Sequence, residues 1–361
     1  MPPQERASGR SRPVGANLRL AGEVSVGPPF YVRRMHAQTR PDWPAVAVFA
    51  VTSLVLSWLI ALPLWLGGRG LGDPFFGLVA AGMMFTPALA TVAALLVQRR
   101  TLGRRPARVV LRELGMWPLR PAARTIWMSV AVIFAAPVLV ALGLFVMSVT
   151  GILTLDLVGF SGFAQTLQNA VPAGTPLPPM GVLVVVQLAS IPLGALFNAP
   201  LAFGEELGWR GWLLPALRPL GTWPALLLSG AFWGLWHAPL ILLGYNFAEP
   251  NALGVLLMIV GCVFFGILLG WTRLRTASVW PAVFAHGAFN ASAGMVALFL
   301  AAGAPTPPLA VMSPLGAVMW GVFAVLVAVL VLLGQFRPAR LSAELGPDRR
   351  PVAAHAASGS A

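Results

Sequence analysis

The sequence predicts an all-α fold: a polytopic bundle of about eight transmembrane helices with both termini in the cytoplasm. Of its 361 residues, 58% are hydrophobic and only 10% are charged, whereas about a quarter of the residues of soluble domains are charged. Apolar blocks of about 20 residues recur along most of the chain, and a helix of that length crosses a bilayer. Arginines gather in the short segments between these blocks, which is the usual topology signal of a membrane protein.

The apolar blocks define the expected elements. Residues 1–44 are rich in Arg, Pro and Gly and are predicted to be a disordered basic segment. The polar residues 335–361 are predicted to be a disordered tail. The residues between them, 45–334, form the predicted transmembrane domain. A connection over 151–180 that contains Pro and Gly is expected to be an irregular external loop. The predicted spans are 45–66, 77–97, 126–150, 181–203, 223–244, 252–271, 279–301 and 313–334.

The charge balance indicates a bilayer rather than a nucleic acid as the partner. The chain carries 24 basic and 11 acidic residues, a net charge of +13, and every basic residue is Arg. These arginines flank apolar blocks, so we predict no nucleic-acid binding. Exclusive use of Arg, beside much Ala, Gly and Pro, suggests a GC-rich bacterial genome and therefore the bacterial cytoplasmic membrane.

The arginines also predict the orientation, because positively charged connections stay in the cytoplasm. The connection over 98–125 holds eight of them, and the connections after the fourth, sixth and eighth spans are basic as well. An even number of spans with both termini inside fits every connection. The other arginines that mark the cytoplasmic side are Arg33, Arg34, Arg40, Arg218, Arg273, Arg275, Arg337 and Arg340.

Ionisable residues inside membrane spans are costly and by default mark function. Between residues 181 and 301, four such residues fall at predicted span ends, where water is expected to solvate them: Arg218, Glu249, Arg273 and Arg275. The five that remain are Glu205, Glu206, Arg210, His237 and His286.

The first candidate group follows the fourth predicted span. Glu206 and Arg210 are four residues apart, so on a helix they share a face and are predicted to pair. Glu205 is turned about 100° away and is expected to be unpaired, free to act on something else. The alternative is that all three form a solvated salt-bridge cluster at the cytoplasmic interface.

Two histidines complete the candidate set. His237 lies well inside the fifth predicted span with Trp233 four residues before it, and His286 shares a helix face with Asn290. Each group alone could be a polar contact between helices. Together with Glu205 they can activate a water molecule: a carboxylate accepts the proton, imidazoles hold a metal or stabilise charge, and a carboxamide donates to an oxyanion.

Depth in the membrane separates these groups in the predicted topology. His286 lies about 10 Å from the cytoplasmic start of its span and His237 about 20 Å from its own, at 1.5 Å per residue. For them to meet, the fifth span must tilt or begin later than drawn, or the helix that carries Glu205 must enter the bilayer.

Three motifs in this order resemble those of the CPBP family of intramembrane proteases, also called the Abi or type II CAAX prenyl protease family. The resemblance covers roughly residues 181–301, and it departs from the family pattern where Trp stands for the usual Phe. The matching residues are Glu205, Glu206 and Arg210 for EExxxR, Trp233 and His237 for FxxxH, and His286 and Asn290 for HxxxN.

The resemblance implies a protease core over 181–301 in which Glu205 activates water and His237, His286 and Asn290 line the same site. It implies that Glu206, Arg210 and Trp233 support this site. Cleavage within or near the membrane would be on the cytoplasmic side. His237 and His286 are candidate ligands for zinc. Asn is an uncommon zinc ligand, so a metal-free glutamate protease is the alternative.

The leading hypothesis is therefore an intramembrane endopeptidase whose substrate is a membrane-embedded or lipidated peptide that arrives from the bilayer. Two other classes compete with it. A non-catalytic scaffold or bacteriocin-immunity factor would use the polar residues for helix association, and a proton-coupled transporter would use the Glu and His groups as a relay.

Overall fold

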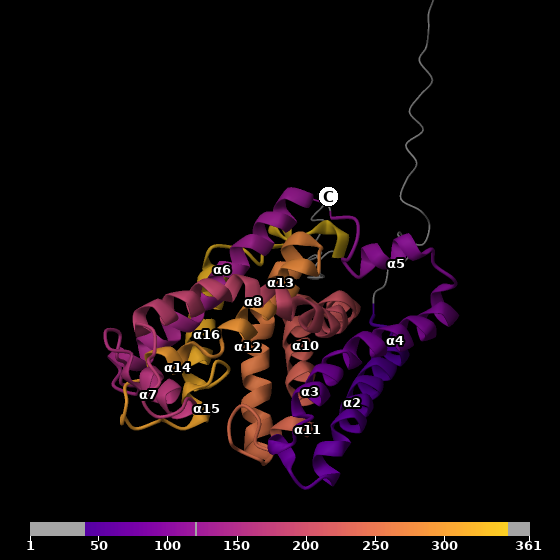
Figure 1. Cartoon of the computed structure of the whole chain (residues 1–361). Helices are drawn as coiled ribbons and strands as arrows, with labels where there is room; N and C mark the ends of the chain where they lie inside the picture. The colour runs from indigo at the N-terminus through magenta and orange to yellow at the C-terminus, as the bar shows by residue number, and fades with distance from the viewer. Residues whose placement is uncertain (1–39, 120, 346–361) are drawn as a thin grey trace, which may run out of the picture.

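The computed structural model describes residues 40–119 and 121–345 and is all-helical over these ranges, which confirms the predicted fold class (Figure 1). Within them, seven helices are long and apolar enough to cross a membrane. The only strand-like feature of the described part is an isolated bridge between Leu155 and Leu300.

The N-terminal half runs from the paired helices α2 and α4 to the long helix α6. Short segments connect these helices, and α7 lies in the connection that was predicted to be irregular. The bounds are α2 Trp43–Leu66, η1 Gly70–Gly72, α3 Phe76–Met84, α4 Thr86–Leu102, α5 Ala107–Glu113, α6 Ala122–Val149 and α7 Ser161–Ala170.

The C-terminal half holds the helices that carry the candidate residues. Of its segments, η2 is a π-helix, and η3, η4 and η5 are 3₁₀ turns. The bounds are α8 Met180–Glu206, η2 Leu207–Leu213, α9 Leu214–Leu217, η3 Arg218–Leu220, α10 Thr222–Trp236, α11 Ala238–Ile241, α12 Ala252–Thr276, α13 Trp280–Ser292, α14 Met295–Phe299, α15 Leu309–Met312, α16 Ala317–Leu332, η4 Pro338–Arg340 and η5 Ala343–Leu345.

The predicted fifth span, 223–244, is broken, so the seven long helices differ from the eight expected spans. Helix α10 has 15 residues and ends at Trp236, because the His237 N–H turns back to Gly234 O and Leu235 O. Helix α11 then starts with Pro239 at its second position. Proline has no N–H for the next helical hydrogen bond, which is why the helix breaks at this point.

The outer surface of the bundle is apolar, as a lipid-facing surface must be. Val138 on α6 and Leu196 and Phe197 on α8 are more than half exposed. Such large exposed apolar side chains are rare over a wide surface of a soluble monomer. The exposure therefore agrees with a bilayer around these helices.

The connections that were predicted to share the cytoplasmic side meet at one end of the bundle. The Arg124 guanidinium donates to Arg275 O, and Arg275 in turn donates to Arg340 O. The ring of Trp223, at the start of α10, lies 4.9 Å from that of Phe336. Arg-rich segments from four parts of the chain are thus neighbours, as the charge pattern predicted.

The ends of the predicted membrane domain are partly described. Residues 1–39 and 346–361, which belong to the two predicted disordered tails, lie outside the described residues. The part of the C-terminal tail that is described carries η4 and η5 and folds back on the bundle. Ser342 N donates to Leu274 O at 2.7 Å, and Glu344 pairs with Arg112 at 2.9 Å.

A helical hairpin brings the candidate residues to one depth. The chain from α8 through η2, α9 and η3 stays helical up to Leu220 and reverses at Gly221, whose φ of 105° is a conformation that favours glycine. Glu205 lies 16 residues before Gly221 and His237 16 residues after it. The helix that carries Glu205 therefore does not end at the interface but runs inside the bundle, which removes the depth conflict.

Close packing of α10 on α12 fixes the second arm of this hairpin. A Cβ atom added at Gly230 would lie 2.7 Å from the Cα of Val263. One at Gly234 would overlap the Cα of Ile259. Small residues four apart are a usual means of bringing membrane helices into backbone contact, and here they hold Trp233 and His237 against the bundle core.

Candidate active site

Glu206 is the centre of a buried ionic group. Its Oε1 accepts a hydrogen bond from Arg210 Nη1 at 2.7 Å and another from His286 Nδ1 at 3.0 Å. The Glu206–Arg210 pair was predicted from spacing and is confirmed, across the junction of α8 with the π-helix η2. The side chains of Glu206 and Arg210 are 0% and 1% exposed, so the alternative of a solvated surface cluster is wrong.

Glu205 faces the other arm of the hairpin. Trp233 Nε1 donates a hydrogen bond of 2.6 Å to its Oε2, and the carboxylate is buried. The expectation that Glu205 is unpaired is therefore wrong, because spacing along one helix does not reveal a donor on another. The second oxygen, Oε1, accepts no hydrogen bond from the part of the chain that the structure describes.

His237 stands at the break between α10 and α11. Its Nδ1 lies 2.8 Å from Trp233 O. A carbonyl only accepts, so this contact requires a proton on Nδ1. In the neutral ring, Nε2 is then the acceptor. The equivalent contact of His286 Nδ1 with the Glu206 carboxylate orients that ring in the same way.

Trp233 contacts Glu205, Arg210 and both histidines of the site. Its indole lies under the Arg210 guanidinium, 4.3 Å from ring centroid to Cζ. The ring centroids of His286 and His237 are 5.3 and 5.9 Å away. The Trp in place of the motif's usual Phe thus keeps an aromatic packing role and adds an N–H donor aimed at Glu205.

A cavity of about 370 Å³ lies between the helices, and its wall includes Glu205, Trp233, His237 and His286. Its volume falls in the usual range for ligand sites. Helices α3, α8, α10, α12 and α13 contribute to the wall, as does the turn after α11. The cavity brings together the four candidate catalytic residues, Glu205, His237, His286 and Asn290.

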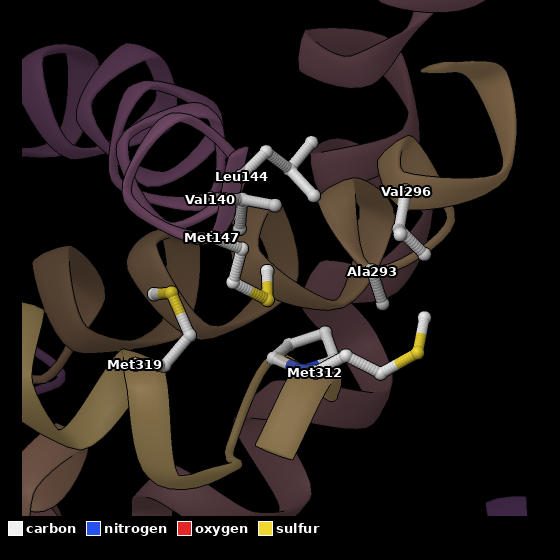
Figure 2. A pocket seen from close by; sticks show the side chains of 8 residues that line it. Val140, Leu144, Met147, Ala293, Val296, Met312 and Met319 are labelled. Carbon is white, nitrogen blue, oxygen red and sulfur yellow. The ribbon is translucent and has the colours of Figure 1, made fainter. Parts of the chain in front are cut away.

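An apolar hollow adjoins this cavity. It measures about 10 Å³, the space of one water molecule, and lies among α6, α14, α15 and α16 (Figure 2). Met147, Met312 and Met319 project into it, and it shares Ala293 and Pro314 with the larger cavity. Two residues of the cavity wall thus also line a small hollow that is rich in methionine, a flexible side chain.

Two arginines that were expected in water at span ends are buried. Arg218 is 5% and Arg273 0% exposed, so this expectation is wrong. Arg273 Nε donates to Arg210 O at 3.0 Å and its Nη2 to Glu113 O at 2.6 Å. Arg273 therefore joins the backbone of the π-helix that carries Arg210 to the C-terminal end of α5.

Sequence reasoning missed four polar residues of the cavity wall: Asn198, Tyr245, Asn246 and Ser313. Asn198 is seven residues before Glu205, hence on the same helix face, a signal that could have found it. Tyr245 and Asn246 follow α11 in a turn and carry no periodic signal.

The donor set does not form a usual metal centre. The described residues include no group of three or more His, Cys, Asp and Glu side chains placed to hold a metal ion, and protein zinc sites normally have at least three such ligands. His237 and His286 are two nitrogen donors, and Asn290 is an uncommon zinc ligand.

Comparison with known proteins agrees with the motifs. Residues 184–292 match the family model described as type II CAAX prenyl endopeptidase Rce1-like. This region belongs to the CPBP family. A curated relative, CAAX prenyl protease 2 of Methanococcus maripaludis, is 30% identical over 100 residues, which are 26% of this chain and 37% of the relative.

The CPBP region contains every candidate site residue. Glu205, the first in the chain, and Asn290, the last, both lie within 184–292. The helices outside this region, α2 to α7 and α14 to α16, are not covered by the family model. The chain spans little more than a third of the length of the relative that it matches.

Proposed function

We propose that this protein is an intramembrane endopeptidase that hydrolyses peptide bonds of hydrophobic or lipid-associated substrates. One observation carries the proposal: Glu205, His237, His286 and Asn290, which lie up to 85 residues apart in sequence, line one cavity inside a bundle of apolar helices. The CPBP region supports the reaction class.

Glu205 is the proposed base. Its Oε1 is available for a water molecule, while Trp233 holds the other oxygen. The carboxylate removes one proton from the water, the hydroxide oxygen attacks the peptide carbonyl carbon, and the carbonyl electron pair moves to oxygen. Glu205 then gives that proton to the amide nitrogen as the C–N bond breaks. General acid–base catalysis of this kind contributes about 10²–10⁴-fold in rate.

The other residues orient the attacking water and stabilise the charge that develops on the carbonyl oxygen. The second O–H of the attacking water donates to Nε2 of His237, since Nδ1 of that ring is already bonded. His286, whose Nδ1 is bonded to Glu206, lines the same cavity. Asn290 donates from its carboxamide to the developing oxyanion. Glu206 and Arg210 hold the His286 ring in position. A metal-free carboxylate mechanism fits this donor set better than a zinc site.

The substrate is proposed to be a membrane-embedded or lipidated peptide in the bacterial cytoplasmic membrane. The cavity lies among helices whose outer surface is apolar, and Met83, Met84 and Met258 in its wall suit an apolar chain. The printed name of the relative, a CAAX prenyl protease, supports a lipid-associated substrate. Helix α13, which carries His286, begins at the Arg-rich end of the bundle. The arginines support a cytoplasmic orientation of this end.

Comparison of wild type with Glu205→Gln tests this function. The matched control is Glu249→Gln, a carboxylate outside the cavity that accepts from Asn251. Membrane-associated peptides from cells that express each form are compared by mass spectrometry. We expect cleavage products with wild type and Glu249→Gln and none with Glu205→Gln.

The same comparison separates the competing functions. Identical peptide profiles for all three folded proteins would contradict the peptidase and favour the scaffold or immunity factor. Substrate flux driven by a proton gradient in proteoliposomes, abolished in Glu205→Gln, would instead favour the transporter.

A further inference from the structure

One polar side chain of the cavity has no role in the proposed function so far. Tyr245 belongs to the turn between α11 and α12 and lines the cavity with Glu205. Its hydroxyl has no hydrogen-bond partner among the described residues, although buried phenols usually find one. A phenol in a catalytic cavity without a protein partner is a donor available to a ligand.

The turn holds this phenol in place through an unusual backbone. Three positions within five residues have positive φ: Gly244 at 96°, Asn246 at 66° and Ala248 at 55°. Such conformations cost a non-glycine residue energy and tend to occur at functional sites. Here they reverse the chain around Tyr245, whose side chain consequently lines the cavity.

Further contacts fix the turn to the catalytic helices. Tyr245 N donates to Leu240 O at 3.1 Å, and Leu240 N donates to His237 O at 3.0 Å. The Asn246 carboxamide donates to the Met258 sulfur on α12 at 3.6 Å. The ring of Tyr245 packs on Phe76 of α3 at a centroid distance of 5.5 Å. The phenol is therefore positioned by the same segment that begins with His237.

We propose that Tyr245 is a further catalytic residue, whose phenol donates a hydrogen bond to the substrate carbonyl oxygen as that oxygen becomes negative. This inference rests on the proposed peptidase function. The O–H proton stays on Tyr245 throughout, so the balance of the hydrolysis is unchanged: water adds across the C–N bond, and Tyr245 and Asn290 share the oxyanion until it collapses.

The protonation state of the phenol agrees with a donor. Burial, together with the charge of Glu205, raises the pKa of Tyr245 above its ordinary value. The phenol therefore keeps its proton at neutral pH.

Tyr245→Phe tests the inference because it removes only the hydroxyl and keeps the ring on Phe76. Loss of one oxyanion donor typically lowers kcat by about 10²–10³-fold. We expect a loss of that order with KM and thermal stability nearly unchanged. Affinity for a peptide aldehyde, whose hydrate mimics the tetrahedral intermediate, should fall by a similar factor, while affinity for the uncleaved peptide should not.

A second measurement does not depend on a cavity mutant. The chain has two tyrosines, Tyr31 and Tyr245, so 3-fluorotyrosine incorporated into a Tyr31→Phe protein labels Tyr245 alone. The ¹⁹F resonance should shift when the peptide aldehyde binds, and should shift less when an uncleaved peptide binds.

The outcomes distinguish the two proposals. If wild type cleaves peptides, Glu205→Gln does not, and Tyr245→Phe retains kcat within about threefold, the role of Tyr245 is overturned and the peptidase stands. An unchanged ¹⁹F resonance in an aldehyde complex also overturns it. If wild type cleaves no peptide, the peptidase falls and the role of Tyr245 falls with it.

Discussion

Glu206 and His286 are 80 residues apart in sequence and are joined by a buried hydrogen bond of 3.0 Å between Oε1 and Nδ1. The bond connects the end of α8 to the middle of α13. The same oxygen also accepts from Arg210. One carboxylate oxygen thus both neutralises a buried cation and sets the direction in which His286 presents Nε2 to the cavity.

Glu206→Gln should therefore destabilise the protein strongly. The substitution keeps the size of the side chain but removes the hydrogen-bonded counter-charge of the buried Arg210 guanidinium. Breaking a buried pair in this way typically costs about 3–5 kcal/mol. We expect a clearly lower apparent melting temperature in detergent, together with loss of peptidase activity because His286 loses its orientation.

Glu344→Gln is the matched control. Its partner Arg112 is 56% exposed and Glu344 itself 36%, and exposed pairs contribute about 0–1 kcal/mol. The melting temperature of this variant should stay close to that of wild type. Equal effects of the two substitutions would contradict the structural role assigned to Glu206.

Gly230→Ala should separate α10 from α12. The added Cβ would lie 2.7 Å from Val263 Cα and 3.0 Å from Cys262 O. Both are main-chain atoms, which cannot move without shifting a helix. Overpacking typically costs about 1–3 kcal/mol, and the shift also moves Trp233 away from Glu205. We expect lower thermal stability and lower activity.

Gly321→Ala on α16 provides the comparison, because no atom lies within 4 Å of the added Cβ. Alanine is a better helix former than glycine by about 1 kcal/mol, so this variant should be as stable as wild type or more so. If Gly230→Ala behaves like Gly321→Ala, close packing at Gly230 is not what positions α10.

Most of the fold could be predicted because an apolar run of 20 residues has few alternatives to a membrane helix. The predicted spans are wrong where a single residue ends a helix or reverses the chain. Pro239 stops α10 inside a predominantly apolar run, and Gly221 places the chain reversal well beyond the end of the apolar block at 203. Hydropathy does not register either effect.

From the sequence, the contacts of the candidate site could be predicted only between residues of the same helix. Spacing gave the Glu206–Arg210 pair correctly, since both residues share a local face. It missed the Trp233 donor to Glu205 and the turn that carries Tyr245, because both depend on how helices pack across the bundle. The motifs identified which residues meet, while the geometry revealed what each one contacts.

The stability of the loop that contains Asp156, outside the membrane spans, is expected to depend on pH. Its carboxylate accepts from the N–H groups of Val158, Gly159 and Ser161. The hydrogen bond from the Ser161 side chain and then those from the backbone hold the pKa of Asp156 well below its usual range. A carboxyl group whose pKa is lower in the folded state stabilises the fold at pH values above its unfolded pKa of about 4. This stabilisation is lost as the pH falls through the folded pKa.

Asp156→Asn should thus weaken the loop at neutral pH but not in strong acid. Hydrogen exchange of peptides from 151–175 should be faster in Asp156→Asn than in wild type at pH 7, and the two should converge as pH falls below about 4. Asp73→Asn removes the charge of a carboxylate that accepts a similar hydrogen bond, from Phe75 N in another connection, and should leave this region unchanged. A difference between wild type and Asp156→Asn that stays constant down to strong acid would contradict the assignment.

Removal of metal tests the proposed carboxylate mechanism. The cavity offers two histidine nitrogens and a carboxamide, and one oxygen of Glu205 is already occupied by Trp233. With this donor set, we expect protein treated with a strong zinc chelator to keep its peptidase rate, and metal analysis to find far less than one zinc per chain. His237→Gln should then lower kcat, since the water loses an acceptor, without changing metal content. Loss of activity on chelation, restored by stoichiometric zinc and abolished in His237→Gln and His286→Gln, would replace this mechanism with a zinc-dependent one.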